Sequence, residues 1–121
     1  MRIEKKKLKG FDSERGLLIP LEFYNVDFEP VRLFYVTNVP KGIRRGEHSH
    51  INTKQLLICV KGQIGVSLID NNKDSYFILD ENEYVYVSDH VWDAQDFLTG
   101  NDVLLVLCST NYNEDDYIFN R

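Results

Sequence analysis

Two histidines, His48 and His50, stand two residues apart in the stretch Gly42–Gly62, just before a run of apolar residues. Side chains two apart on a β-strand share a face, so the imidazoles would lie about 7 Å apart along the strand, at roughly 3.4 Å per residue. Two arginines, Arg44 and Arg45, precede them. Neutral imidazole accepts protons near neutral pH, and guanidinium holds anions. These residues predict a site that binds an anion and moves protons.

The pattern leaves open which arginine faces this site. Strict alternation would place Arg44 on the face of the histidines. A turn at Gly46 could reset the alternation in favour of Arg45. Both arginines are therefore kept as candidates.

The third histidine, His90, lies among turn residues and is expected to be solvated.

Length and composition limit the class of protein. The 121 residues suit a single domain, 1–121, with a core of its own. The net charge is −5 and no large basic face is evident, so no nucleic acid partner is expected. No apolar run nears the ~18 residues of a membrane span, and no secretory signal is expected at the start. Cys59 and Cys108 lie in apolar runs, which predicts buried free thiols in a reducing cytoplasm.

The hydrophobic pattern predicts an all-β fold, because short β-branched and aromatic runs alternate with turn residues. A turn at Lys61–Gln63 is expected to join its two flanking runs as a hairpin. The last dozen residues are expected to be helical or irregular, with Asn113–Asp116 as a solvated helix start. A lysine-rich edge strand is expected at residues 1–10. The other expected strands are Leu17–Phe23, Val31–Asn38, Leu56–Val60, Ile64–Ile69, Ser75–Leu79, Tyr84–Val87 and Val103–Ser109.

The spacing of Gly42, the two histidines, Gln55 and Gly62 resembles the first motif of the cupins, which are jelly-roll barrels. A weaker second match lies at Ser88–Asp93. In metal-binding cupins a glutamate stands where this chain has Gln55, and a histidine where it has Asp93. A neutral amide is a poor ligand for a divalent metal. The sequence therefore predicts a cupin (jelly-roll) barrel that uses its histidines as acid and base, without a metal.

A closer resemblance covers about Phe11 to Ile118. It is carried by the segments Arg15–Gly16, Val39–Gly42, Arg44–His50, Lys54–Gly62, Val103–Leu107 and Asp115–Ile118. Together they resemble the sugar 3,4-ketoisomerases, also called the WxcM-like or FdtA-like family, in which glutamine is usual at the position of Gln55. The resemblance implies conversion of a dTDP-linked 4-keto-6-deoxyhexose to its 3-keto isomer, for the 3-amino sugars of surface polysaccharides. It also implies that no cofactor is needed, and a homodimer, commonly with exchanged N-terminal strands.

The resemblance further implies roles for single residues. A 3,4-shift of a ketone passes through an enediol or enediolate, which needs a base with a pKa near neutrality. His48 matches the family's catalytic histidine and is expected to be that base, with His50 as proton shuttle or hydrogen-bond donor. Family members usually have tyrosine where Phe34 stands. The residues expected to bind substrate are Arg15, Tyr35, Arg44, Arg45, Tyr86 and Asp93, of which Arg15 and Asp93 could pair near C4.

Two other functions stay open. A sugar 3,5-epimerase on the same fold would use the same base but exchange protons at C3 and C5. A non-catalytic cupin would bind a nucleotide sugar or a metal without turnover. The departures from the family pattern at Phe34, Gln55 and Asp93 are the features that support this last reading.

Overall fold

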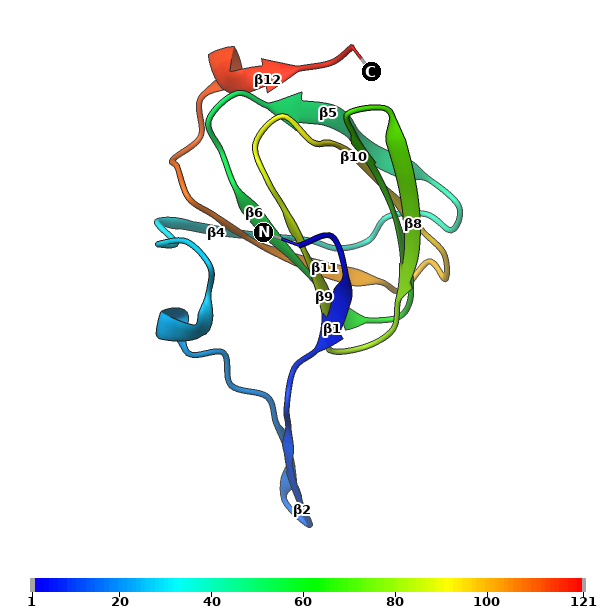
Figure 1. Ribbon diagram of the computed structural model, residues 1–121. Helices are drawn as coiled ribbons and strands as arrows, with labels where there is room; N and C mark the ends of the chain where they lie inside the picture. Colours follow the sequence, from blue (N-terminus) through cyan, green and yellow to red (C-terminus); the bar gives the residue numbers. More distant parts are fainter. Residues whose placement is uncertain (1, 121) are drawn as a thin grey trace.

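The computed structural model describes residues 2–120, which form two five-stranded antiparallel sheets and a separate two-stranded hairpin (Figure 1). In strand order, the first sheet contains β1 (Lys5–Lys7), β9 (Glu83–Val87), β6 (Gln55–Lys61), β11 (Val103–Cys108) and β4 (Arg32–Val36). The second contains β12 (Tyr117–Ile118), β5 (Arg44–His50), β10 (Trp92–Phe97), β7 (Ile64–Asp70) and β8 (Lys73–Leu79). The hairpin pairs β2 (Phe11–Ser13) with β3 (Gly16–Leu18). The all-β prediction is confirmed, and the two sheets form a jelly-roll barrel.

The main core lies between the two sheets. Strand β7 contributes Val66 and Leu68 from one side, and β6 contributes Leu57 and Cys59 from the other, all of them buried. The alternate residues of β6, including Leu56, are buried as well, because the N-terminal segment packs over the outer face of the first sheet. Strand β6 is thus covered on both faces. This double burial explains why residues 56–59 within it are apolar without interruption.

The predicted hairpin across Lys61–Gln63 is wrong. Strand β6 pairs with β9 and β11, whereas β7 pairs with β10 and β8, so the chain passes here from one sheet to the other. The turn signal itself is real, since Gly62 has a φ of +82°. The buried Asp102 carboxylate holds this crossing by accepting hydrogen bonds from the Gln63 and Thr99 backbone amides at 2.8 and 3.0 Å. A turn signal marks a change of direction but does not say which strand comes next to which.

Two other predicted elements are shorter than expected. The run Leu17–Phe23 forms a strand only at β3, and a 3₁₀ turn, η1 (Phe23–Asn25), follows Pro20. Proline has no backbone N–H to donate to a ladder. The C-terminal tail contains a second 3₁₀ turn, η2 (Glu114–Asp116), capped by the Asn113 side chain, and then β12. No helix within residues 2–120 has the length and apolar character needed to cross a membrane.

Candidate active site

A cavity of about 680 Å³ opens between the two sheets, which is within the usual size range of small-molecule sites. Its apolar lining comes from inward-facing residues of β4, β6 and β11, among them Phe34, Leu57 and Val106. Most of the functional polar side chains lie opposite this lining, on β5, β10 and β12, whereas Arg32 and Gln55 belong to β4 and β6. The polar residues around the cavity include Arg32, Arg45, His48, Gln55, Asp93, Gln95 and Tyr117.

A β-bulge in β5 decides which side chains face this cavity. Asp93 of β10 pairs with His48, but the next residue, Ala94, pairs with Gly46, so Glu47 is an extra residue in β5. Gly46 and Glu47 have φ values of +86° and +60°. A Cβ at Gly46 would lie 2.8 Å from Gln95 Oε1 and 3.2 Å from the Asp93 carbonyl oxygen, so this position strongly favours glycine. The bulge reverses the alternation and places both Arg45 and His48 at the cavity.

The two imidazoles pack edge to face, with ring centroids 4.8 Å apart. Burial lowers the pKa of His48 below 6.5, and a hydrogen bond with the Gly46 backbone partly opposes this effect. His50 is 3% exposed, and burial, followed by the nearby His48, lowers its pKa to about 4. Both rings are therefore neutral at pH 7. A neutral imidazole in a partly enclosed cavity can act as a general base.

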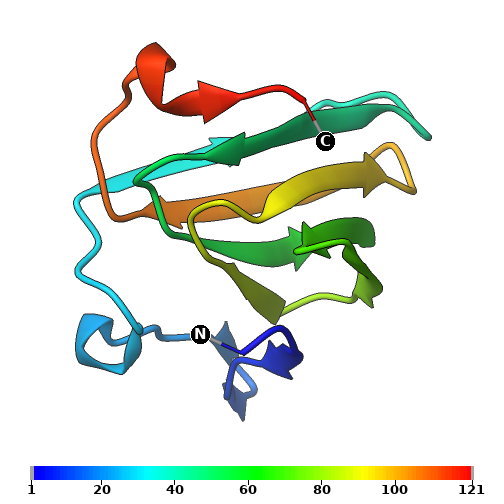
Figure 2. The ribbon, with the colours of Figure 1, turned by 45° about the horizontal axis from the view of Figure 1, so that its top comes forward.

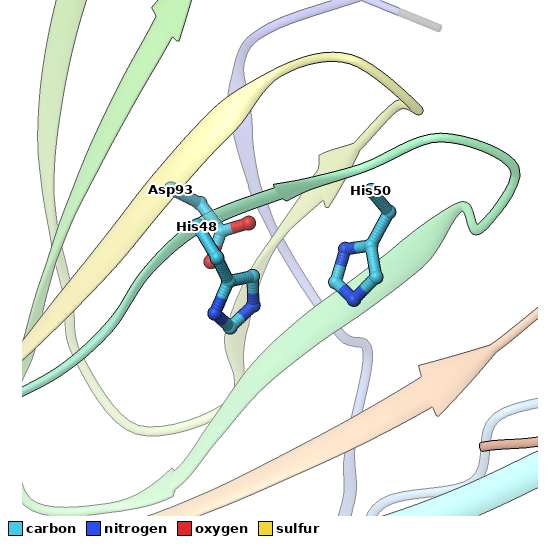
Figure 3. Close-up of side chains that lie close together, drawn as sticks. All are labelled: His48, His50 and Asp93. Carbon is cyan, nitrogen blue, oxygen red and sulfur yellow. The ribbon is translucent and has the colours of Figure 1, made fainter. Parts of the chain in front are cut away.

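Asp93 lies beside these histidines and is fully buried, with 1% of its surface exposed (Figure 3). Gln95 Nε2 donates a hydrogen bond of 2.5 Å to Asp93 Oδ1. The other oxygen, Oδ2, has no hydrogen-bond partner among residues 2–120. Burial raises the pKa of the carboxyl group to about 7, against the smaller opposing effect of the bond from Gln95. Asp93 is therefore a carboxyl group that can carry a proton near neutral pH.

His48, His50 and Asp93 supply ligand types typical of first-row divalent metals. One donor atom from each lies within 4.8 Å of the others. Two ligands bound about 2.1 Å from one ion lie at most about 4.2 Å apart, so a shared ion would require these side chains to move closer together. The three residues suit a cation by chemical type, but their present spacing does not form a coordination sphere.

The C-terminal segment closes one side of the site. Strand β12 lies beside the end of β5 (Figure 2). In this pair Tyr117 is opposite His50. The Tyr117 ring contacts both imidazoles, at centroid distances of 4.9 Å from His48 and 4.5 Å from His50. Tyr117 was not among the residues predicted for the site, although it belongs to a segment that carried the family resemblance.

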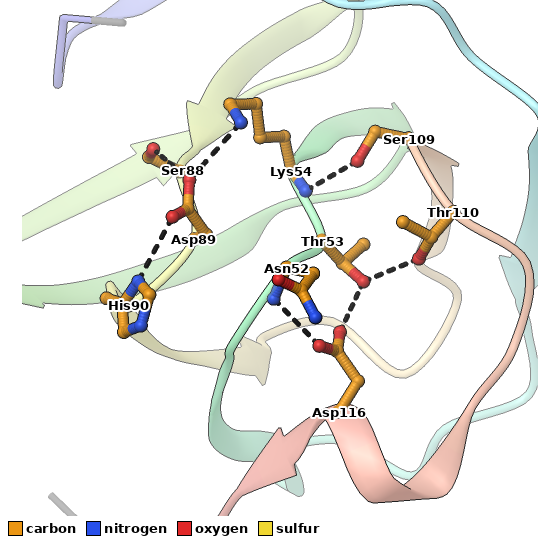
Figure 4. A network of polar contacts seen from close by, with 9 residues as sticks. All are labelled: Asn52, Thr53, Lys54, Ser88, Asp89, His90, Ser109, Thr110 and Asp116. Atoms are coloured by element: carbon orange, nitrogen blue, oxygen red, sulfur yellow. Dashed lines mark hydrogen bonds and ion pairs between the residues drawn. The ribbon is translucent and has the colours of Figure 1, made fainter.

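Asp116 anchors this C-terminal segment. Its carboxylate accepts hydrogen bonds from the Asn52 backbone amide, at 2.7 Å, and from the Thr53 hydroxyl (Figure 4). The Thr53 hydroxyl also bonds to that of Thr110 at 2.6 Å. Asp116 is buried, so the prediction that Asn113–Asp116 is wholly solvated is wrong for this residue. In contrast, His90 is exposed as expected and pairs with its neighbour Asp89.

The two adjacent arginines of β5, Arg44 and Arg45, differ in whether they line the cavity. Arg45 lines the cavity. Arg44 instead forms a two-pronged ion pair with Asp96, with Nε–Oδ1 and Nη2–Oδ2 distances of 2.8 and 3.1 Å, and does not line the cavity. Arg32, which was not predicted for the site, lines the cavity with its guanidinium 4.7 Å from the Phe34 ring centroid. Alternation along β4 does place Arg32 on the inward face with Phe34, so the signal was present in the sequence.

The structure does not bring the remaining predicted residues together within one chain. Tyr35 borders the cavity but is 66% exposed, while its neighbour Phe34 faces inward. Tyr86 lies on the outer face of the first sheet, where its hydroxyl accepts a hydrogen bond of 3.0 Å from the Asp27 amide. Arg15 is exposed at the turn of the β2–β3 hairpin, which projects from the barrel (Figure 1). Arg15 does not line the cavity, and the expected pair with Asp93 is not formed within the chain.

The fold and the site define a jelly-roll barrel with a neutral histidine and two arginines at one cavity. A family model described as FdtA: WxcM-like, C-terminal, matches residues 1–121. The chain belongs to this family.

Individual relatives agree with this assignment. A TDP-4-oxo-6-deoxy-alpha-D-glucose-3,4-oxoisomerase from Aneurinibacillus thermoaerophilus is 32% identical over 111 residues, which cover 91% of this chain and 80% of that protein. The sugar 3,4-ketoisomerase QdtA from Thermoanaerobacterium thermosaccharolyticum, solved with TDP, is 34% identical, with a TM-score of 0.90 over 98% of this chain and 88% of its own. WlaRA, a TDP-fucose-3,4-ketoisomerase from Campylobacter jejuni, is 25% identical, with a TM-score of 0.87 over 99% and 90% of the two chains.

Proposed function

We infer that this protein is a sugar 3,4-ketoisomerase that converts a dTDP-linked 4-keto-6-deoxyhexose to its 3-keto isomer. The observation that carries this inference is the neutral, partly buried His48 in a cavity of about 680 Å³, in a chain that belongs to the FdtA family. Its relatives bear the names of TDP-sugar 3,4-ketoisomerases. A His→Asn variant of QdtA was solved with TDP-4-keto-6-deoxyglucose.

His48 takes the proton from C3 of the sugar. One ring nitrogen is engaged by the Gly46 backbone, which leaves the other available to accept a proton. His50 is buried and in contact with His48, so it is suited to support that ring and not to carry charge. General acid–base catalysis of this kind contributes about 10²–10⁴ in rate.

Arg32 and Arg45 bind the negative charge of the substrate. Both line the cavity, and they approach it from different sheets, Arg32 on β4 and Arg45 on β5. A guanidinium group can bind a diphosphate or a developing enediolate oxygen with two parallel hydrogen bonds. Because the chain has a net charge of −5, such local cations matter more for binding an anion than its overall field.

The active protein is a homodimer with exchanged N-terminal segments. The β2–β3 hairpin projects from the barrel and exposes Phe11, Leu17 and Leu18, of which 54%, 55% and 66% are accessible. A second copy that buried these side chains would remove this exposed apolar surface from water. The same exchange would carry Arg15, at the tip of the hairpin, toward a different barrel.

The buried free thiols of Cys59 and Cys108 suit a cytoplasmic enzyme.

Incubation of the purified protein with dTDP-4-keto-6-deoxyglucose, followed by proton NMR of the product in D₂O, tests this function. The 3-keto isomer should form, and C5 should keep its hydrogen. Deuterium at C5 would instead indicate a 3,5-epimerase. No conversion, with the nucleotide sugar still bound, would favour a non-catalytic binding protein.

A further inference from the structure

We propose that Asp93 is a second proton-transfer residue, which acts on the substrate oxygens while His48 acts on the carbons. Its carboxylic acid gives a proton to the oxygen at C4 and later takes one from the oxygen at C3. This inference rests on the proposed ketoisomerase function.

The position of Asp93 supports direct contact with a bound sugar. Asp93 lines the same cavity as His48, which is its register partner in the β5–β10 pair. Gln95 holds Oδ1 in place and leaves Oδ2 without a hydrogen-bond partner among the described residues. A buried carboxyl oxygen without a partner is costly. A hydroxyl or carbonyl oxygen of the sugar would supply the missing partner.

The surroundings keep this carboxyl group protonated near neutral pH. Burial raises the pKa of Asp93 to about 7. The hydrogen bond from Gln95 favours the anion, but burial has the larger effect. The facing groups on β6 and β7, Gln55 and Leu68, carry no charge. The titratable or charged groups around the site are His48, His50 and Arg45 on β5, Arg32 and Tyr35 on β4, Cys108 on β11 and Tyr117 on β12.

A 3,4-ketone shift needs four proton movements, and the two groups account for all of them. His48 takes the proton from C3, and the Asp93 acid protonates the C4 carbonyl oxygen, which gives the enediol. The Asp93 carboxylate then takes the proton of the C3 hydroxyl as the new carbonyl forms. The imidazolium returns its proton to C4. C3 is oxidised and C4 is reduced by the same electron pair, and both residues end in their starting states.

Replacement of Asp93 by asparagine tests the proposal, because the amide keeps the shape but cannot donate and recover a proton. We expect kcat of Asp93→Asn to fall by at least about 10²-fold. Affinity for TDP, measured by calorimetry, should stay within about threefold, since a group acting in the transition state contributes little to ground-state binding. Asp96→Asn is the matched control on the same strand, because Asp96 pairs with Arg44 outside the cavity. The control should keep the wild-type kcat.

The pH profile separates proton transfer from a merely structural role. Asp93 must be protonated in the free enzyme, so kcat/KM of the wild type should decline as pH rises through about 7. The residual activity of Asp93→Asn should lack this alkaline decline. A variant that keeps wild-type kcat, or that keeps the same alkaline decline, would overturn the proposal.

A measurement on the free wild-type protein does not depend on the variant or on turnover. The Asp93 carboxyl carbon should titrate near pH 7 by ¹³C NMR, and its signal is assigned by its absence from Asp93→Asn. Titration in the ordinary aspartate range would overturn the proposal. So would stoichiometric metal in the wild type that is lost in Asp93→Asn. If the carboxyl group titrates near 7 but the wild type forms no 3-keto product, the proposed function fails and the assigned role falls with it.

Discussion

At the scale of the residue, the site depends on burial of groups that would be charged in water. His48, His50 and Asp93 each lie where desolvation disfavours the ionised form. Burial therefore lowers the pKa of the imidazoles and raises that of the carboxyl group. The result is a neutral base beside a neutral acid, which is the starting state that an enolisation needs.

The acid side of the pH profile reports on His48. Protonation of its ring removes the base, so activity is lost only as pH falls through a pKa that lies below 6.5. We expect kcat/KM, measured from about pH 5 to 8, to keep more than half its maximum at pH 6.5. A midpoint of the acid decline above 6.5 would contradict the buried, uncharged state of this ring.

The two adjacent arginines offer a matched comparison. Arg45→Ala should raise KM for the nucleotide sugar by about tenfold or more, because a hydrogen bond to a charged group contributes about 1.5–3 kcal/mol. Arg44→Ala should leave KM nearly unchanged, since Arg44 pairs with Asp96 outside the cavity. Steady-state kinetics of both variants checks this. The opposite ranking would show that Arg44 holds the substrate.

At the scale of the element, the bulge in β5 links the sequence to the site. Alternation correctly predicts that Arg32 and Phe34 share a face on β4, because that strand is regular. The same rule fails for Arg44 and Arg45, because the extra residue Glu47 shifts the register. Glycine at position 46 made a bulge conceivable, but only the paired strand β10 decides where it falls.

Gly46→Ala tests the bulge. An alanine at φ +86° is strained by roughly 1–2 kcal/mol, and its Cβ would also press on Gln95. We expect turnover to fall by about tenfold or more, because small displacements of catalytic groups are costly. Gly42→Ala is the control, since Gly42 has a φ of +85° and no atom within 4 Å of the added Cβ. Similar loss of turnover in both variants would show that the effect is general instability and not displacement of the site.

Much of the architecture was predictable, and the errors concern long-range pairing. The strand runs Val31–Asn38 and Ile64–Ile69 correspond closely to β4 and β7, because their β-branched and apolar content is a local property. The partner of each strand is not local, so the supposed hairpin between β6 and β7 was wrong. The prediction missed Tyr117 for the same reason, because β12 pairs with β5 from the far end of the chain.

At the scale of the whole molecule, the barrel holds the cavity, but the β2–β3 hairpin lies apart from it. Of the residues predicted to bind substrate, Arg15 is the one on this hairpin. The homodimer proposed above provides a partner for the exposed apolar side chains of the hairpin and a route for Arg15 to a second cavity. Oligomeric state and activity should therefore be coupled.

Replacement of Leu17 and Leu18 together by serine tests this coupling. The wild type should sediment as a dimer, and the double variant should dissociate at micromolar concentration, because it loses apolar area worth roughly 25 cal/mol per Å². Its turnover should fall in parallel. Ile78→Ser is the control, since Ile78 is also exposed but lies on β8, away from the hairpin. A monomeric wild type with full activity would contradict the dimer.

The central claim is that His48 removes the proton from C3 of a nucleotide-linked 4-keto sugar. The most direct measurement is the position of deuterium in dTDP-4-keto-6-deoxyglucose and its product after incubation in D₂O with the wild type and with His48→Asn. The wild type should form the 3-keto isomer, with deuterium at C4 in the fraction of turnovers in which the His48 imidazolium exchanges its proton with solvent before it returns one to carbon. His48→Asn should bind TDP normally, form no 3-keto isomer and exchange no carbon-bound hydrogen. Undiminished exchange at C3 in His48→Asn would contradict the assignment of the base.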